Sequence, residues 1–333
     1  MNILLTGGAG YIGAAVAREL EQAGHRLWIV DNFTTGHRET CALLQGSRVE
    51  WVEGDLGDRG LLERLLGKVA FDGCVHVAGS AQVEESMVQP DLYYRNNVAC
   101  GLTLLDSLRR ARVRSLVFSS SAAVYGTPRE CPIEEEHPTC PTNVYGETKL
   151  AFERMLHWFH RAGGPGYLAL RYFNAAGASR DGLLGEEHEP ETHLIPNLLT
   201  AALAGKPVTI FGEDYPTPDG TCVRDYVHLE DLARAHRLGL ELLARENRGE
   251  AVNLGSGRGY SVKEVIAAVQ ETTGASLKVE VRPRREGDPP VLVASRRKAE
   301  ILLDWVPQFS EIGGILETAW AWHRRKSRSV GAS

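Results

Sequence analysis

The sequence predicts an α/β fold: a doubly wound parallel sheet followed by a smaller C-terminal α/β lobe. Three observations support this. Strand-like and helix-like segments alternate through the first half, a glycine-rich turn follows the first strand, and loops rich in Gly, Pro, Glu and His begin near residue 175. Such alternation is typical of a parallel sheet covered by helices on both faces. We expect a first domain over residues 1–175, to which later segments could return, a second lobe over 176–326, and a flexible tail over 327–333.

Six short apolar segments are expected to form the strands of the sheet. Each is rich in aliphatic residues and is separated from the next by a segment of helical length. The six segments are residues 2–5, 27–30, 49–52, 74–77, 115–119 and 167–171.

Helices are predicted from their caps and their apolar periodicity. One helix begins near Thr142 or Asn143 and stops at Gly163. In the second lobe, residues 231–245 have helical periodicity, and Ser261 with Glu264 forms a capping box that opens a helix reaching about Thr273.

Composition limits the classes of function. The chain has 333 residues, 43% of them hydrophobic, and a formal net charge of -6, so no broad basic surface for nucleic acid is expected. No apolar run approaches the length of a membrane span, and the six cysteines show no C-x-x-C or zinc-like spacing. We therefore expect a cytoplasmic protein with no nucleic-acid partner, no membrane partner and no metal site.

The glycine-rich turn suggests a nucleotide site of the Rossmann type. Gly7, Gly10 and Gly13 follow the first strand and open a helix with the spacing G-x-x-G-x-x-G. Gly7 permits a tight turn, Gly10 lets the backbone approach a pyrophosphate, and Gly13 allows close packing while the helix N-terminus faces the negative charge. A plain turn could use the same glycines, so the motif needs support from elsewhere.

Asp31 provides that support because it ends the second predicted strand. A carboxylate there can accept both hydroxyls of an adenosine ribose, and it would repel a 2′-phosphate, so NAD is favoured over NADP. Asp55 follows the third strand, where it could help to hold the adenine edge or be an ordinary turn residue.

Tyr145 and Lys149 lie four residues apart on one predicted helix, so their side chains should be neighbours. An adjacent cation favours the phenolate. Moving a phenol pKa from about 10 to about 7 takes roughly 4 kcal/mol, which one cation at about 4 Å supplies at an effective dielectric near 20. Such a pair alone is common on solvated helix faces. Together with the glycine turn, and with Ser121 at the end of the fifth strand, it suggests hydride chemistry on an alcohol.

With these motifs together, the chain resembles the extended short-chain dehydrogenase/reductase family and, within it, the UDP-galactose 4-epimerases. The likeness covers nearly the whole chain, and its second-lobe segments are the discriminating ones. Besides the motifs above, the segments that carry it are residues 85–86, 93–98, 118–126 and 170–178 in the first half, and 211–226 and 284–288 in the second lobe.

This resemblance implies an isomerase that interconverts UDP-galactose and UDP-glucose through a transient 4-keto sugar, using tightly bound NAD. It implies that Tyr145 is the catalytic base, that Lys149 positions the nicotinamide ribose and lowers the tyrosine pKa, and that Ser121 hydrogen-bonds the sugar 4-hydroxyl. It also implies a homodimer. The residues expected to contact NAD are Gly7, Gly10, Tyr11, Ile12, Gly13, Asp31, Asn32, Asp55, Leu56, Ala78, Gly79, Asn96, Ser119, Tyr145, Lys149 and Phe173.

The UDP-sugar should be held largely by the second lobe. Arginine forks match phosphate oxygens, an aromatic ring can stack on uracil, and a carboxylate can accept from a ribose hydroxyl. Each arginine taken alone could equally be a surface ion pair. The expected substrate contacts are Ser121, Tyr145, Asn174, the backbone of Leu194, Phe211, Arg224, Arg285, Asp288 and Leu292.

Four positions depart from the family pattern. Ala81 stands where a lysine is frequent, which removes one cofactor contact, Ala123 replaces a frequent threonine, and His193 replaces a frequent asparagine. Leu292 stands where a bulky tyrosine excludes N-acetylated sugars and a smaller residue admits them. We therefore expect mainly UDP-glucose and UDP-galactose turnover with some activity on N-acetylated UDP-sugars; an epimerase of UDP-N-acetylglucosamine and UDP-N-acetylgalactosamine, or a dual-substrate enzyme, is the alternative.

Other classes of protein with this fold need different residues or give different products. A nucleotide-sugar 4,6-dehydratase needs an acid pair after the catalytic serine or threonine, and here Ser121 precedes Ala122 and Ala123. A net oxidoreductase would accumulate NADH. A redox-sensing binding module without chemistry commonly loses the tyrosine or the lysine, and both are present.

Overall fold

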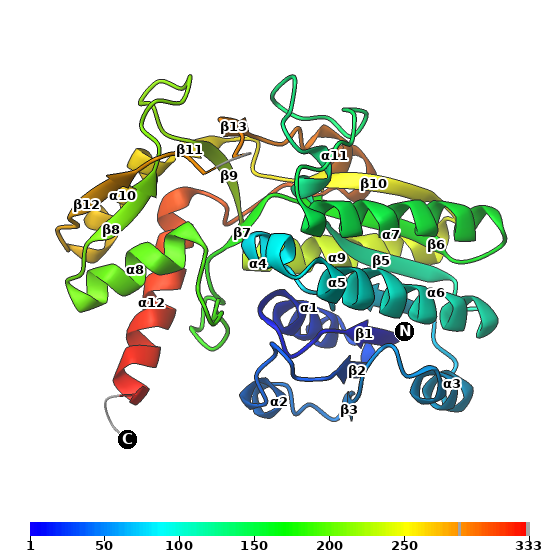
Figure 1. Cartoon of the computed structure of the whole chain (residues 1–333). Coiled ribbons are helices and arrows are strands. Elements are labelled where there is room, and N and C mark those ends of the chain that lie inside the picture. Colours follow the sequence, from blue (N-terminus) through cyan, green and yellow to red (C-terminus); the bar gives the residue numbers. More distant parts are fainter. Residues whose placement is uncertain (286–287, 331–333) are drawn as a thin grey trace.

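A seven-stranded parallel sheet forms the centre of the larger lobe, in the strand order β10-β6-β5-β4-β1-β2-β3 (Figure 1). The computed structural model describes residues 1–285 and 288–330. The strands of this sheet are β1 (Asn2–Thr6), β2 (Arg26–Asp31), β3 (Val49–Glu53), β4 (Gly73–His76), β5 (Ser115–Ser121), β6 (Gly166–Tyr172) and β10 (Gly249–Leu254).

Helices cover both faces of the sheet. One apolar cluster lies between the sheet and a helical layer that includes α1 and α9, and a second lies between the sheet and the layer of α3, α6 and α7. The helical segments of this lobe are α1 (Tyr11–Gln22), α2 (Glu39–Leu43), α3 (Arg59–Lys68), α4 (Val83–Val88), α5 (Pro90–Tyr93), the π-helix η1 (Tyr94–Cys100), α6 (Gly101–Arg110), the 3₁₀-helix η2 (Ala122–Tyr125), α7 (Val144–Arg161), α9 (Leu229–Arg245) and α11 (Arg297–Leu303).

The smaller lobe has two short sheets and its own apolar core. Strand β9 pairs with β7, β11 and β13, while β8 pairs with β12, and three helices pack nearby (Figure 1). These elements are β7 (Asn174–Ala176), α8 (Leu194–Ala204), β8 (Val208–Phe211), β9 (Val223–His228), β11 (Gly259–Ser261), α10 (Val262–Thr273), β12 (Val279–Arg282), β13 (Val291–Leu292) and α12 (Ile312–Val330).

The expected fold class is confirmed. The six predicted strands are all present, with ends that differ by one or two residues, and Ser261 and Glu264 form the expected capping box. A seventh strand, β10, comes from the second half of the chain and pairs with β6. Helix α12 reaches Val330, which corrects the expected tail over 327–333: residues 327–330 continue the helix, and 331–333 lie outside the described part.

A buried ion pair joins α7 to the sheet. Glu153 of α7 and Arg171 of β6 approach to 2.6 Å, and both side chains are 8% exposed. Glu153 also accepts a hydrogen bond from Ser120 of β5 at 2.5 Å. Because a buried charge without its partner is strongly unfavourable, this pair fixes how α7 lies on the sheet.

Across the described residues, no helix is long and apolar enough to cross a membrane.

Candidate active site

The predicted site residues of the larger lobe converge at the carboxyl ends of the parallel strands. Strands β1 and β4 are neighbours at the centre of the sheet, where the strand order reverses. Crevices at such a reversal are the usual ligand sites of open α/β sheets. The turn after β1, Asp31 of β2, the segment after β4 and Ser121 of β5 all lie along this edge.

The glycine turn has the shape that a pyrophosphate requires. Gly7 has φ +76°, and a Cβ on Gly13 would lie 1.9 Å from the carbonyl oxygen of Gly7, so neither position accepts a side chain without a shift. A Cβ on Gly10 would meet only the Gly7 oxygen, at 3.7 Å. Gly10 is the N-cap of α1 and brings no capping side chain, so the N–H groups of the first turn can serve an anion.

Asp31 lies beside this turn, as predicted. One of its carboxylate oxygens accepts from the backbone N–H of Ala9 at 2.9 Å, and the other accepts from the N–H of Phe33 at 2.8 Å. Asn32 donates to the exposed Asp55 at 2.9 Å. These contacts hold the carboxylate next to the helix N-terminus, an arrangement that fits the ribose and pyrophosphate of a dinucleotide.

Tyr145 and Ser121 are brought together at the start of α7. Asn143 caps the helix by accepting from the N–H of Gly146 at 2.8 Å, and the N–H of Tyr145 donates to Ser86 of α4 at 3.1 Å. Tyr145 is 8% exposed. Burial raises the pKa of its phenol, and a hydrogen bond with Ser121 opposes that rise.

Lys149 is buried one turn further along the helix. Its ammonium donates to the carbonyl oxygen of Ser119 at 2.9 Å and lies 5.8 Å from the centre of the Tyr145 ring. Burial lowers the pKa of Lys149 to about 8, although nearby Glu153 favours its charged form. Burial outweighs the hydrogen bond with Ser121, so the net shift of the phenol pKa is upward. The expectation that Lys149 lowers this pKa stays a prediction.

The remaining predicted cofactor residues surround the same edge. Gly79, which follows β4 with Ala78, lies beside Lys149: a Cβ on Gly79 would be 3.5 Å from the lysine nitrogen. Asn96 donates to Ser80 at 3.0 Å. Leu56 and Phe173 are buried, whereas Tyr11 and Ile12 at the start of α1 are half-buried.

Ser119 and Tyr11 already have hydrogen-bond partners in the protein. The Ser119 hydroxyl is buried 2.9 Å from Nε2 of His236, so its link to the site is the carbonyl that holds Lys149. The Tyr11 hydroxyl donates to the carbonyl oxygen of Gly177 at 2.7 Å and thereby ties α1 to the segment after β7.

In the smaller lobe, the predicted diphosphate and ribose residues form ion pairs. Arg224 of β9 pairs with Asp288, and Arg285 pairs with Glu84 of α4 at 3.2 Å. The guanidinium of Arg285 also lies over the ring of Phe211, 4.2 Å from its centre. Glu286 and Gly287, which belong to the segment that carries the resemblance, lie outside the described residues.

Leu292 connects this lobe to the catalytic groups. It pairs with Arg224 across the β13–β9 ladder and packs on a small buried cluster that includes Ala122 and Phe173. Asn174 of β7 donates to the carbonyl of Asp225 at 3.1 Å, and Leu194 is the first residue of α8.

Two kinds of residue were missed from the sequence. Asn97 and Glu153 hold the site from behind: Asn97 binds the backbone of Ser80 and the hydroxyl of Thr148, and Glu153 anchors α7. Tyr145 and Glu153 are eight residues apart and so lie on one helix face, and this spacing could have revealed Glu153. A group of Glu and His side chains in residues 186–193 was missed as well.

A Rossmann-type sheet with a glycine turn, a ribose-facing carboxylate and a Ser, Tyr and Lys at one edge defines a dinucleotide-dependent enzyme acting on an alcohol or a carbonyl group. Residues 3–255 match the NAD dependent epimerase/dehydratase family. The chain belongs to this family, which confirms the resemblance seen in its sequence.

Similar proteins extend the likeness over nearly the whole chain. The UDP-glucose 4-epimerase of Halalkalibacterium halodurans is 46% identical over 325 residues, covering 97% of this chain and 96% of the relative. The Brucella ovis UDP-glucose 4-epimerase in complex with NAD has a TM-score of 0.91 at 44% identity, covering 96% and 97% of the two chains. The Bifidobacterium longum enzyme in complex with NAD+ and UDP has a TM-score of 0.92 at 37% identity, covering 98% and 99%.

Replacing Gly13 with Ala is expected to remove NAD binding, because the new methyl group would lie 1.9 Å from the Gly7 oxygen. Relief of the overlap should cost about 1–3 kcal/mol and displace the turn from the pyrophosphate. The measurement is the NAD content of the purified protein. Gly67→Ala in α3 is the matched control, since a Cβ there meets nothing within 4 Å; equal NAD content in both variants would contradict the assigned role of the turn.

Proposed function

We propose that this chain catalyses the reversible C4 epimerisation of UDP-galactose and UDP-glucose with bound NAD. The observation that carries the proposal is the meeting of Tyr145, Ser121 and Lys149 at the carboxyl edge of the sheet, next to the glycine turn. The family membership and the names of the similar proteins support the same activity.

In this proposal, Tyr145 removes the proton of the sugar 4-hydroxyl and later returns it, while Ser121 hydrogen-bonds the same oxygen. The chemistry that bound NAD supplies is acceptance of a hydride from C4 and its return to the other face of the transient 4-keto sugar. Lys149 hydrogen-bonds the nicotinamide ribose and holds its charge near the phenol. Burial supports a proton-transfer role because it excludes water from the phenol and the ammonium.

The two lobes divide the remaining contacts. The residues of the cofactor set around the glycine turn and Asp31 hold NAD, and Asn174, the Leu194 backbone, Phe211, Arg224, Arg285 and Asp288 hold the UDP portion. Arg224 and Arg285 are suited to a diphosphate because a ligand phosphate can replace their carboxylate partners, of which Glu84 is exposed on α4 of the larger lobe.

This chain lacks the acidic residues that a dehydratase needs after the catalytic serine. The two residues after Ser121 are Ala122 and Ala123, which form η2, and the N–H of Ala123 donates to Ser121 at 3.2 Å. The structure therefore favours return of the proton and hydride to C4 over elimination of water.

Replacing Tyr145 with Phe should lower the conversion of UDP-galactose by about 10²–10⁴-fold, the usual contribution of a positioned acid–base group. The assay is incubation with UDP-galactose without added NAD, followed by identification of the products and of any free NADH. Wild-type protein should give UDP-glucose without accumulating NADH. Tyr94→Phe, on an exposed tyrosine, is the control; full activity in Tyr145→Phe, or a stable 4-keto-6-deoxy product from the wild type, would refute the mechanism.

Leu292 sets the preference between plain and N-acetylated sugars in this proposal. It is half-buried beside Ala122 and Phe173, and so close to Ser121. Leu292→Tyr should reduce kcat/KM for UDP-N-acetylgalactosamine by about 10–200-fold, the range that one pocket contact provides, and change that for UDP-galactose little. Leu292→Met, which conserves volume, is the control. Faster wild-type turnover of UDP-N-acetylgalactosamine than of UDP-galactose would reverse the proposed order.

We further propose that the enzyme is a cytoplasmic homodimer. The cysteines are free thiols, as a reducing compartment favours. Large apolar side chains are exposed along α4 to α7, where an isologous contact could cover them: Met87, Val88, Leu92, Tyr94, Leu102 and Trp158.

Trp158→Glu should convert the dimer to a monomer because it places a charge in this apolar surface, and Trp158 is 66% exposed. Light scattering coupled to size exclusion measures the mass. Ile301→Glu, on an equally exposed residue of α11, should leave the mass unchanged. A monomeric wild type would refute the dimer.

A further inference from the structure

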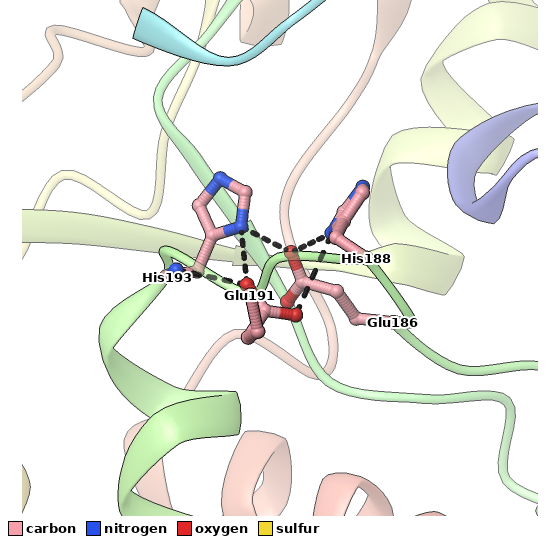
Figure 2. A group of neighbouring side chains, drawn as sticks. All are labelled: Glu186, His188, Glu191 and His193. Atoms are coloured by element: carbon pink, nitrogen blue, oxygen red, sulfur yellow. Dashed lines mark hydrogen bonds and ion pairs between the residues drawn. The ribbon is translucent and has the colours of Figure 1, made fainter. Parts of the chain in front are cut away.

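Four potential metal ligands meet in the segment that leads into α8. Figure 2 shows Glu186, His188, Glu191 and His193 with their side chains turned toward one another. One ligand atom from each residue can be chosen so that all four lie within 4.8 Å of one another. The four residues form the pattern Glu-x-His-x-x-Glu-x-His, which the spacing of Cys and His alone does not reveal.

Several distances within this group are close to the edges of a small coordination polyhedron. Nδ1 of His193 lies 2.9 Å from Glu186 and 3.0 Å from Glu191, and Nδ1 of His188 lies 3.5 Å and 3.6 Å from the same two carboxylates. A tetrahedral ion with ligands at about 2.0–2.1 Å has edges of about 3.3 Å. The two distances to Glu186 bracket that length. Glu191 meets the two imidazoles with different oxygens, and one atom from each of the four residues can be chosen so that all lie within 4.8 Å.

Nδ1 of His188 points to a missing partner. The atom is buried and has no hydrogen-bond partner, although it faces the two carboxylates. Buried polar atoms are normally satisfied, and an ion shared with the two carboxylates would satisfy this nitrogen.

The carboxylates also favour a cation between them. Glu186 is 7% exposed, and within the described residues its ion pairs, like those of Glu191, are with the two imidazoles. The centre of the group therefore attracts positive charge, which a proton or a metal ion can provide.

The ligands are held in place by a second layer of contacts. One oxygen of Glu191 accepts from the backbone N–H groups of Thr192 and His193, both at 2.8 Å. Glu187, between the ligands, pairs with Lys326 of α12, and the carbonyl of Pro190 accepts from Gln82 at 3.4 Å. Outer contacts of this kind orient metal ligands and tune their affinity.

We propose that Glu186, His188, Glu191 and His193 bind one divalent transition-metal ion of the Zn²⁺ class. Two imidazole nitrogens and two carboxylate oxygens suit such an ion, and its two charges balance the two carboxylates. The ion fastens residues 186–193 immediately before Leu194, at the start of α8, and so stiffens the entry to the smaller lobe. The proposal of a metal site does not rest on the proposed epimerase activity.

The test uses full-length protein without an affinity tag, stripped by a chelator that is then removed. Co²⁺ is added first because it absorbs in the visible range when bound in a tetrahedral site. Wild-type protein should show this absorption with one equivalent of Co²⁺, Zn²⁺ should displace it, and thiolate-to-cobalt bands should be absent. Appearance of those bands would place the ion on cysteines and overturn the proposal.

Two variants of the proposed ligands and two control variants distinguish metal coordination from a general electrostatic attraction of cations. Glu186→Gln and His188→Gln should weaken Zn²⁺ binding, measured against a chromophoric chelator, by about 10–100-fold or more. Glu189→Gln removes an exposed neighbouring charge without removing a ligand, and His157→Gln removes an exposed imidazole on α7; both should bind like the wild type.

Several results would overturn the proposal. They are the absence of a cobalt spectrum in the wild type, an equal loss of affinity in Glu189→Gln and Glu186→Gln, or unchanged affinity in both ligand variants. Because a ligand variant could fold poorly, the melting temperature of the wild type is measured with and without Zn²⁺. A rise that is reversed by chelator is expected, and no rise at saturating Zn²⁺ would also refute the site.

Discussion

The buried pair of Glu153 and Arg171 is the constraint on which the candidate active site depends. Tyr145, Lys149 and Glu153 are spaced by four along α7 and so share one helix face. Glu153 joins that face to β6 through Arg171 and to β5 through Ser120. Arg171 in turn donates to Tyr125, whose hydroxyl donates to Asn253 of β10. A shift of α7 would break this network and leave charges buried without partners, so the register of the helix is fixed two turns away from the phenol.

The three serines of strand β5 contact different partners because successive side chains alternate between the faces of a sheet. Ser119 turns toward α9 and meets His236, while Ser120 turns toward α7 and meets Glu153. Ser121, at the strand end, is left for Tyr145. The carbonyl of Ser119 completes the arrangement by accepting from Lys149. One short strand therefore holds the helix, holds the lysine and presents a hydroxyl to the phenol.

The sequence predicted what depends on local patterns. Strand periodicity, the glycine turn, the cap at Asn143 and the capping box at Ser261 all depend on neighbouring residues, and the structure contains each of them. The errors and omissions involve partners far apart in the chain. Strand β10 was missed because its place beside β6 is set by packing, and the pairing of Arg224 with Asp288 joins residues 64 apart. The expected effect of Lys149 on the pKa of Tyr145 stays a prediction, because the spacing of the two residues gives their proximity and not the burial of the phenol.

That burial changes what kind of catalyst the pair makes. A phenol whose pKa is raised holds its proton firmly, and the phenolate left after its removal is a stronger base than an exposed one. Lys149, with its pKa lowered to about 8, lies close enough for the low dielectric to enhance its attraction to a phenolate. A phenolate that takes the proton of the 4-hydroxyl becomes a neutral phenol while the sugar is oxidised, and it returns that proton when the hydride goes back to C4. Burial alone opposes the phenolate that this step requires, so the proposed base depends on the ammonium of Lys149 to stabilise its charge.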